Sequence, residues 1–155
     1  MGAVLRSSDG FGNNGGRVTT VIDLTAELAK LTMLQGRTPQ TTSADRMGSS
    51  VQLAPYRDGA LFTTKFSGEG AWERHMKGDE LVHVLDGSTT LDIVVDDGPP
   101  QSLTMHAGMV AIVPQGAWHR FRSSDGVTVM TATPLPTDHI RLDVDDPRTV
   151  EPPSA

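Results

Sequence analysis

Two stretches decide how this chain folds, and the first reads Trp72-Glu73-Arg74-His75-Met76-Lys77-Gly78-Asp79-Glu80. The second reads Gly108-Met109-Val110-Ala111-Ile112-Val113-Pro114-Gln115-Gly116-Ala117-Trp118-His119. Glu73 and His75 are two residues apart, so their side chains project from the same face of one strand. A tight turn after His75 returns Glu80 on a neighbouring strand, and the second stretch turns at Pro-Gln-Gly to return His119. The two stretches therefore predict two strand–turn–strand units on which imidazole and carboxylate groups converge.

Beyond residue 50, the sequence alternates apolar and polar residues with the period of two that is typical of strands. Turn sequences such as Asp58-Gly59, Asp86-Gly87 and Asp125-Gly126 separate short runs rich in Val, Thr, Ile and Phe. We expect strands at residues 51–56, 60–66, 71–76, 80–86, 89–95, 101–105, 109–113, 117–123 and 126–133. Many short strands at even spacing predict an all-β fold, either a sandwich or a closed barrel.

One helix is expected before the strands, at residues 23–35. Leu24, Leu28 and Leu31 recur at helical spacing, which favours an amphipathic helix. Gly36 follows this segment and is placed to end the helix.

The two ends of the chain differ in composition from its middle. Residues 1–17 are rich in glycine and hold too little apolar surface to offset the entropy of ordering, so we expect a flexible tail. Residues 136–155 combine prolines with acids and are expected to form a second tail, with room for a short edge strand around Ile140. Residues 18–135 then form the single domain that a chain of 155 residues is expected to hold.

Composition bears on the class of function. The chain has 19 acidic and 13 basic residues and a formal net charge of −6, which does not favour nucleic acid as a partner. It has no cysteine, so no thiolate can serve as a nucleophile or a zinc ligand. No apolar run approaches the roughly 18 residues of a membrane span, and the N-terminus lacks the layout of a secretion signal. We therefore expect a cytoplasmic protein with no membrane partner.

The spacing of the two stretches resembles the motifs of the cupin superfamily, G-x5-H-x-H-x3-4-E-x6-G and G-x5-P-x-G-x2-H-x3-N. Seven positions fall in register, and they are His75, Glu80, Gly87, Gly108, Pro114, Gly116 and His119. The resemblance covers residues 60–133. It implies a cupin or double-stranded β-helix (jelly-roll) barrel, to which the short N-terminal helix is added.

Imidazole and carboxylate groups that converge in a small barrel form a natural site for a divalent transition metal. By resemblance to the family, the predicted metal ligands are Glu73, His75, Glu80 and His119. The alternative is a barrel that has lost its metal, but a buried Glu80 without a cation or partner would be costly. We expect one divalent transition metal ion per chain.

Three positions depart from the family motifs. Glu73 stands where the family has its first histidine, Gly68 is displaced from the opening glycine, and Ser123 replaces the final asparagine. Among these, the first change touches the metal, and Glu73 either supplies a carboxylate ligand or stands back as a base or as a group that supports the ligands. Two histidines with two carboxylates favour Fe(II) or Mn(II), with Zn or Ni as further options.

The remaining histidines are expected away from the site. His83 lies three positions after Glu80, on the opposite face of that strand. His106 precedes a turn glycine and His139 lies in the C-terminal tail, so both are assigned to the surface.

The cavity is expected to be apolar around the metal centre. Strand alternation turns Val82, Val84 and Phe121 inward together with Glu80 and His119. Such a pocket suits a small organic substrate better than a highly charged phosphate.

These features favour a metal-dependent enzyme that acts on a small organic molecule, with dioxygenase-type oxidation as the first hypothesis. In that scheme Glu73, if it is not a ligand, removes a proton from the substrate. A second reading uses the metal as a Lewis acid for isomerase, lyase or cyclase chemistry. The alternative from another class is a non-catalytic sensor that binds a metal or a metabolite.

A homodimer is expected from the outer surface of the barrel. Leu81 and Leu85 point outward, and Trp72 and Trp118 are placed on the outer side as well. The helix at 23–35 cannot cover so much apolar surface, so a second copy of the chain is the expected cover.

Overall fold

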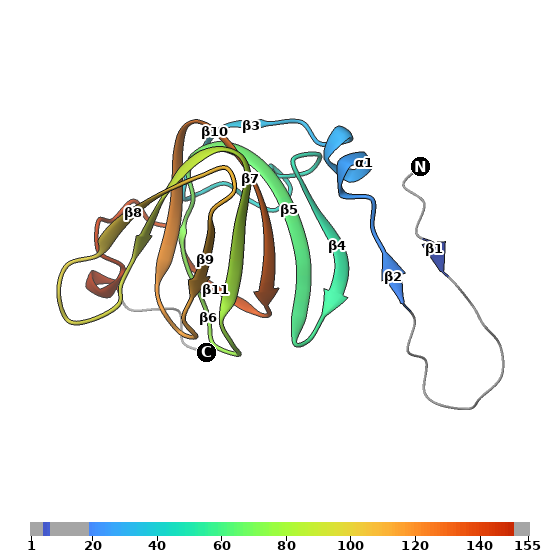
Figure 1. The fold of residues 1–155 in the computed structure, drawn as a ribbon. Helices are drawn as coiled ribbons and strands as arrows, with labels where there is room; N and C mark the ends of the chain where they lie inside the picture. Colours follow the sequence, from blue (N-terminus) through green and yellow to red (C-terminus); the bar gives the residue numbers. More distant parts are fainter. Residues whose placement is uncertain (1–4, 7–18, 151–155) are drawn as a thin grey trace.

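The architecture is mostly β, with one short α-helix, as the sequence predicts (Figure 1). The structure is a computed structural model that describes residues 5–6 and 19–150, so most of the expected N-terminal tail lies outside the described residues. In chain order, the elements are β1 (Leu5–Arg6), β2 (Thr20–Val21), α1 (Leu24–Ala29), β3 (Leu34–Arg37), β4 (Ser50–Tyr56), β5 (Gly59–Glu69), β6 (Trp72–His75), β7 (Glu80–Ile93), β8 (Gln101–His106), β9 (Val110–Val113), β10 (His119–Pro134), β11 (Thr137–Ile140) and the 3-10 helix η1 (Pro147–Thr149). Within this described part, no helix is long and apolar enough to cross a membrane.

Nine strands, β3 to β11, form a single curved sheet (Figure 1). β10 lies at its centre and pairs antiparallel with β5, β6 and β7. β7 in turn pairs with β8 and with β9. β11 pairs with β6, and both β3 and β4 pair with β5. The short β1 and β2 pair separately with each other.

Two pairs of expected strands are joined into two long strands. The segments predicted at 80–86 and 89–95 form β7, and those at 117–123 and 126–133 form β10. Gly87 and Gly126 have positive φ angles of 74° and 107°, and the pairing of β7 with β10 shifts register beside them. A Cβ on Gly87 would collide with the carbonyl of Gly126, so the two backbones can meet there because glycine lacks one. These glycines therefore mark bulges in continuous strands, not turns between strands.

The predicted helix at 23–35 is too long. Asp23 caps α1 by accepting a hydrogen bond from the amide of Ala26 at 3.0 Å, but the helix ends at Ala29. Residues 34–37 instead form β3, parallel to β5, and the amide of Gly36 donates to the hydroxyl of Ser67 at 3.1 Å. Pairing with a strand about 30 residues further along the chain outweighs the local helical pattern.

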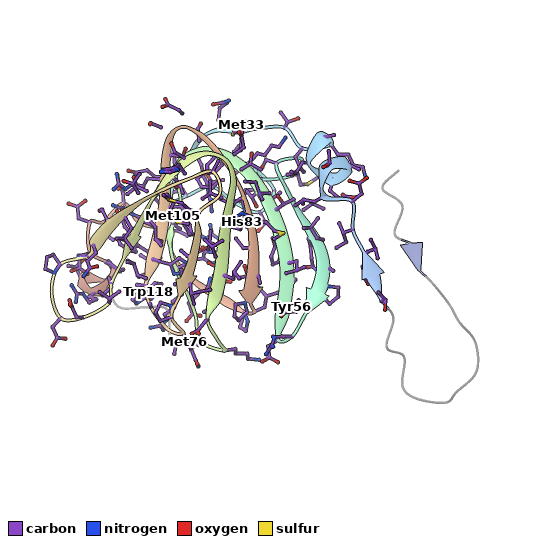
Figure 2. The ribbon with its side chains drawn as sticks, viewed as in Figure 1. Met33, Tyr56, Met76, His83, Met105 and Trp118 are labelled. Carbon is purple, nitrogen blue, oxygen red and sulfur yellow. The ribbon has the colours of Figure 1, made fainter. Side chains whose placement is uncertain are left out.

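The main core is built from side chains of β5, β7, β8, β9 and β10, and it includes Met105 (Figure 2). Its buried members are Phe66, Val82, Val84, Leu91, Ile93, Met105, Val113, Phe121, Val127 and Val129. Val82 and Val84 are fully buried, as the inward orientation predicted for them requires. Burial of these apolar side chains stabilises the curved sheet that carries the site.

A second apolar cluster lies outside the main core, around Trp72 and Trp118. These side chains are 1% and 8% exposed, because the C-terminal segment packs over them through Ile140 and Val144. The indole of Trp72 also donates a hydrogen bond to the carbonyl of Val144 at 2.8 Å. The two tryptophans are therefore covered by their own chain, and their expected contribution to an exposed dimer face is wrong. The sheet also continues through β11, past residue 135.

Candidate metal centre

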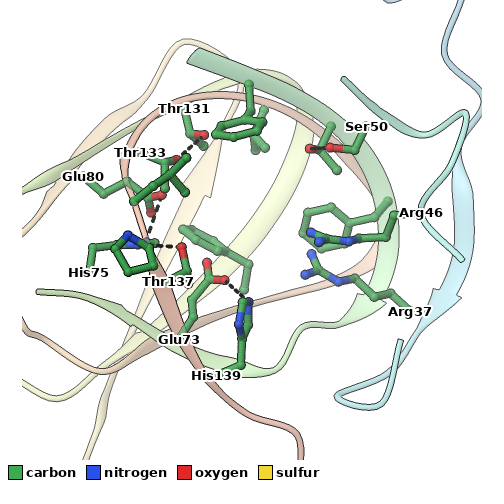
Figure 3. Close-up of a pocket in the computed structure, with 17 residues that line it drawn as sticks. Arg37, Arg46, Ser50, Glu73, His75, Glu80, Thr131, Thr133, Thr137 and His139 are labelled. Carbon is green, nitrogen blue, oxygen red and sulfur yellow. Dashed lines mark hydrogen bonds and ion pairs between the residues drawn. The ribbon is translucent and has the colours of Figure 1, made fainter. Parts of the chain in front are cut away.

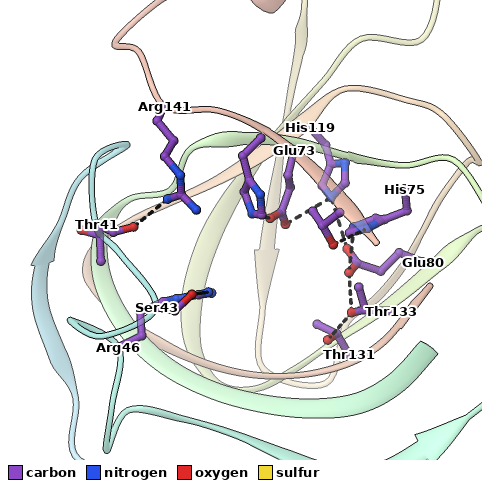
Figure 4. A network of polar contacts seen from close by, with 12 residues as sticks. Thr41, Ser43, Arg46, Glu73, His75, Glu80, His119, Thr131, Thr133 and Arg141 are labelled. Atoms are coloured by element: carbon purple, nitrogen blue, oxygen red, sulfur yellow. Dashed lines mark hydrogen bonds and ion pairs between the residues drawn. The ribbon is translucent and has the colours of Figure 1, made fainter. Parts of the chain in front are cut away.

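Three strands bring the four predicted ligands together. β6 carries Glu73 and His75 on one face, β7 begins at Glu80, and β10 begins at His119. His119 is the register partner of Glu73 across β6 and β10. One donor atom from each residue lies within 4.8 Å of those of the other three (Figure 4). Residues separated by up to 46 positions in the sequence thus form one compact cluster.

The cluster is buried, and its atoms are close enough to interact directly. Nε2 of His75 lies 3.1 Å from Oε2 of Glu80, and Nε2 of His119 lies 3.2 Å from Oε1 of the same carboxylate. Nε2 of His119 also lies 3.5 Å from Oε1 of Glu73. His75, Glu80 and His119 are at most 3% exposed, whereas the Glu73 side chain is 19% exposed. Glu73 is therefore the member that solvent or a substrate can reach.

Hydrogen bonds orient both imidazoles toward the cluster. Nδ1 of His119 lies 3.0 Å from the carbonyl of Ala117, which can accept but not donate, so Nδ1 carries a proton. In the neutral ring, the lone pair of Nε2 then faces the carboxylates. Nδ1 of His75 is held by the hydroxyl of Thr137 at 3.1 Å. Within the described residues, the buried Nε2 of His75 makes no aligned hydrogen bond, although Glu80 lies beside it. A buried nitrogen without a partner fits a metal ligand.

Glu80 is fixed by a hydroxyl as well as by the histidines. The hydroxyl of Thr133 donates to Oε2 of Glu80 at 2.6 Å, and its oxygen lies 2.8 Å from the hydroxyl of Thr131. Because Thr133 donates to the carboxylate, Thr131 must donate to Thr133. This chain of hydroxyls favours the ionised carboxylate, which is the form that binds a metal.

The electrostatics of the cluster call for a cation. Burial alone would raise the pKa of Glu73, but hydrogen bonds from His119 and His139 hold that pKa well below its usual range. For the imidazole of His119, burial would lower the pKa, but its hydrogen bonds to Glu73 and Glu80 raise that pKa to about 10. Without metal, His119 therefore keeps a proton that offsets the two carboxylates, and a bound metal would take the place of that proton.

His139 was wrongly assigned to the surface. It lies on β11, where it is the register partner of Glu73, and its Nε2 is 3.5 Å from Oε2 of Glu73 (Figure 3). Its side chain is one-quarter exposed and faces the pocket. Thr137 and His139 share a strand face, but the sequence contained no signal that this face turns toward the cluster. His106 is exposed, as predicted.

The fold and these residues match a known family. The Cupin domain model matches residues 60–133, the region that holds both motifs. The chain is a cupin. Its mostly β fold with one short helix is a cupin fold, and its cluster of two histidines and two glutamates is typical of cupin metal sites.

This cupin is similar to two curated relatives named acireductone dioxygenase. The one from Rhodopseudomonas palustris strain TIE-1 is 36% identical over 103 residues, which cover 66% of this chain and 56% of the relative. The one from strain ATCC BAA-98 / CGA009 is 38% identical over 73 residues, or 46% of this chain and 41% of the relative. The cupin thus spans about half the length of these relatives.

Two solved structures share the fold. A conserved protein of unknown function from Streptococcus pyogenes is 18% identical, with a TM-score of 0.50 over 79% of this chain and 93% of its own. A hydroquinone 1,2-dioxygenase in complex with Cd2+ and 4-hydroxybenzonitrile is also 18% identical, with a TM-score of 0.50 over 57% of this chain and 64% of its own.

The cluster opens into a cavity of about 520 Å3 (Figure 3). Phe62, Phe66 and Phe121 line part of the wall, so Phe121 faces inward as expected. Val82 and Val84 belong to the core and do not line the cavity. The expectation of an apolar cavity is also incomplete, since two arginines line the side opposite His75 and Glu80.

Proposed function

We propose that this cupin is a metal-dependent enzyme that acts on a small organic substrate, with dioxygenase-type oxidation as its reaction. The observation that carries the proposal is the buried cluster, in which two imidazole nitrogens and two carboxylates converge at the end of a cavity. The partial similarity to proteins named acireductone dioxygenase supports the oxidative reaction over other metal-dependent chemistry.

One divalent transition metal would be held by Glu73, His75, Glu80 and His119. With two oxygen donors in the set, Fe(II) or Mn(II) is preferred over softer ions. When bound, such an ion supplies Lewis-acid polarisation of a substrate oxygen and redox capacity toward dioxygen.

Glu73 is the residue placed to move a proton. It is the most exposed member of the cluster, and Oε2 of its carboxylate faces Nε2 of His139 at 3.5 Å. A substrate in the cavity would meet this carboxylate, and a proton taken by Glu73 could pass to His139. If Glu73 instead binds the ion, His139 would orient its second oxygen.

The cavity wall would position the substrate and limit access of water. Phe62 and Phe121 present aromatic faces, and the ring of His119 meets that of Phe121 edge-on with centroids 5.9 Å apart. Exclusion of water by such a wall strengthens the electrostatic interactions of the cluster with a bound substrate.

Elemental analysis after anaerobic reconstitution with Fe(II) or Mn(II) should find about one metal ion per chain. Oxygen consumption should follow with a panel of small enediols and hydroxylated acids that begins with acireductone. His119→Ala should lose both the metal and the oxygen uptake. Full metal occupancy in His119→Ala would refute the site. Turnover of a substrate without oxygen uptake would assign isomerase, lyase or cyclase chemistry instead, and metal binding without turnover would favour the sensor.

A further inference from the structure

Three arginines lie at the side of the cavity that is away from the ligand cluster. Arg37 and Arg46 line it, and Arg141 lies close by (Figures 3 and 4). In the part of the chain that the structure describes, none of the three has a carboxylate oxygen within 4.0 Å. Arg120, which is buried, is instead paired with Asp92 at 2.8 Å. Arg57 also has no carboxylate partner among the described residues, but it lies exposed to solvent outside the cavity, whereas Arg37 and Arg46 face the cavity.

Arg37 is held rigidly although its charge has no partner. Its guanidinium carbon lies 4.9 Å from the centre of the Phe66 ring, and a Cβ on Gly70 would lie 3.4 Å from that carbon. The backbone of Arg37 is fixed by β3, which approaches β5 closely at Gly68, where a Cβ would collide with it. Nε of Arg37 is buried, and its N–H donates to no partner among the described residues. Burial lowers the pKa of this guanidinium, which nevertheless stays charged.

Arg46 and Arg141 add to this positive field without neutralising it. Arg46 makes one long contact, from its guanidinium to the hydroxyl of Ser43 at 3.5 Å. Arg141 donates from Nη1 to the carbonyl of Thr41 at 2.9 Å, and its other guanidinium nitrogens have no hydrogen-bond partner among the described residues. Both arginines lower the pKa of Arg37 through charge repulsion. Two like charges thus line one side of the cavity, with the exposed Arg141 nearby, and this arrangement favours an anionic ligand.

The ligand cluster does not balance these positive charges. Its two carboxylates would be matched by a divalent ion, and both lie beside Nε2 of His119, at 3.5 Å for Glu73 and 3.2 Å for Glu80. Glu73 does attract Arg37, but the two side chains form no ion pair within 4.0 Å among the described residues. The positive side of the cavity therefore faces its interior with its charge uncompensated.

We propose that Arg37 and Arg46 bind the carboxylate of the substrate, so that the substrate is a small organic anion that spans the cavity from these arginines to the ligand cluster. The planar guanidinium forms paired hydrogen bonds with a carboxylate, and the low solvent access of Arg37 strengthens them. This inference rests on the proposed function for the role of the anion as substrate, but the anion site itself is defined without the metal. The aromatic wall would lie against the body of the substrate.

The test uses benzoate, benzamide and phenyl phosphate as probes and the full chain after treatment with EDTA. NMR titration, which reads weak affinities, should show that benzoate binds at least about tenfold more tightly than benzamide. Arg37→Gln should weaken benzoate binding by about 10- to 100-fold and leave benzamide unchanged. Arg57→Gln removes the same charge at an exposed turn outside the cavity, and it should bind benzoate like the unaltered chain.

Arg46→Gln gives an independent measurement if Arg37→Gln does not fold, and it should also weaken benzoate binding. Equal binding of benzoate and benzamide, or no binding of benzoate at about 10 mM, would overturn the proposal. Phenyl phosphate that binds about tenfold more tightly than benzoate would overturn the carboxylate assignment in favour of phosphate.

The same titration on metal-loaded protein separates this proposal from the proposed function. Benzoate binding that requires metal and ignores Arg37→Gln would place the carboxylate on the ligand cluster and refute the arginine site. Binding that depends on Arg37 in a chain that takes up no metal would support the anion site and refute the metal-dependent enzyme.

Discussion

Replacing Thr133 with valine should weaken metal binding without changing any proposed ligand. The hydroxyl of Thr133 donates to Oε2 of Glu80 at 2.6 Å, and both residues are at least nine-tenths buried. Valine has nearly the same shape but cannot donate a hydrogen bond. The substitution therefore leaves the donor set intact and removes one group that orients the carboxylate.

The expected magnitude follows from the charge and burial of Glu80. A hydrogen bond to an ionised group contributes about 1.5–3 kcal/mol, which corresponds to about 10- to 100-fold in an equilibrium constant. Loss of a partner that orients a metal ligand reduces metal affinity over the same range. We therefore expect Thr133→Val to raise the dissociation constant of Mn(II) or Fe(II) by about 10- to 100-fold.

The assay is anaerobic titration of the EDTA-treated protein with the metal, followed by elemental analysis of the saturated samples. Thr64→Val is the matched control, because its hydroxyl bonds to Ser50 at 2.8 Å and lines the same cavity without contacting Glu80. The control should bind metal like the unaltered chain. A metal affinity of Thr133→Val within about twofold of that control would show that Glu80 is not an oriented ligand.

Three further predictions address the cluster, acid stability and assembly. Glu73→Gln should lower metal affinity by about tenfold or more if Glu73 is a ligand, or lower turnover by about 100-fold with full metal content if it is a base. If neither metal affinity nor turnover changes, Glu73 only forms part of the pocket surface. Asp92 is 3% exposed, and although burial opposes it, hydrogen bonds from two arginines and Ser102 lower its pKa from 3.8 to about 2. Its ionised form therefore stabilises the fold by about 2 kcal/mol above pH 3.8, and this stabilisation is lost as the pH falls toward 2. In chemical denaturation, Asp92→Asn should abolish that part of the pH dependence. An unchanged pH profile in the variant would count against the ion pairs. We also expect a homodimer, since Val110 and Ile112 on β9 are more than half exposed, and a monomer mass in light scattering at micromolar concentration would contradict it.

The sequence predicted those parts of the site whose residues are close together in the chain or belong to a family motif. Glu73 and His75 share a face because they are two residues apart in a strand, and the tight turn before Glu80 fixes its return. His119 is more distant, and its placement rested on the resemblance of the second motif to the cupin family. All four donor atoms converge in the structure, as this reasoning predicted.

The parts that the sequence missed depend on pairing between distant segments. The helical spacing of Leu24, Leu28 and Leu31 is real, but it does not say where the helix must stop. That limit is imposed by β3, which exists because β5 offers it a parallel partner. His139 was missed for the same reason, since β11 becomes a strand by pairing with β6. Local pattern contains neither partner, so local reasoning assigned residues 34–35 to a helix and residues 136–155 to a tail with room for a short edge strand.

These two strands supply much of the polar chemistry of the cavity beyond the ligand cluster. β3 carries Arg37, and β11 carries Thr137 and His139, which contact His75 and Glu73 respectively. The motif-bearing strands β6, β7 and β10 supply the donors, so they determine whether a metal can bind. The added strands supply the groups that a substrate would meet after the metal site is formed, namely an unpaired guanidinium and an imidazole beside the exposed carboxylate. Substrate choice in this cupin should therefore respond to substitutions in β3 and β11 that leave metal content unchanged. Arg37→Gln is the most direct case, because the side chain of Arg37 forms no ion pair within 4.0 Å with the carboxylates of the ligand cluster among the described residues.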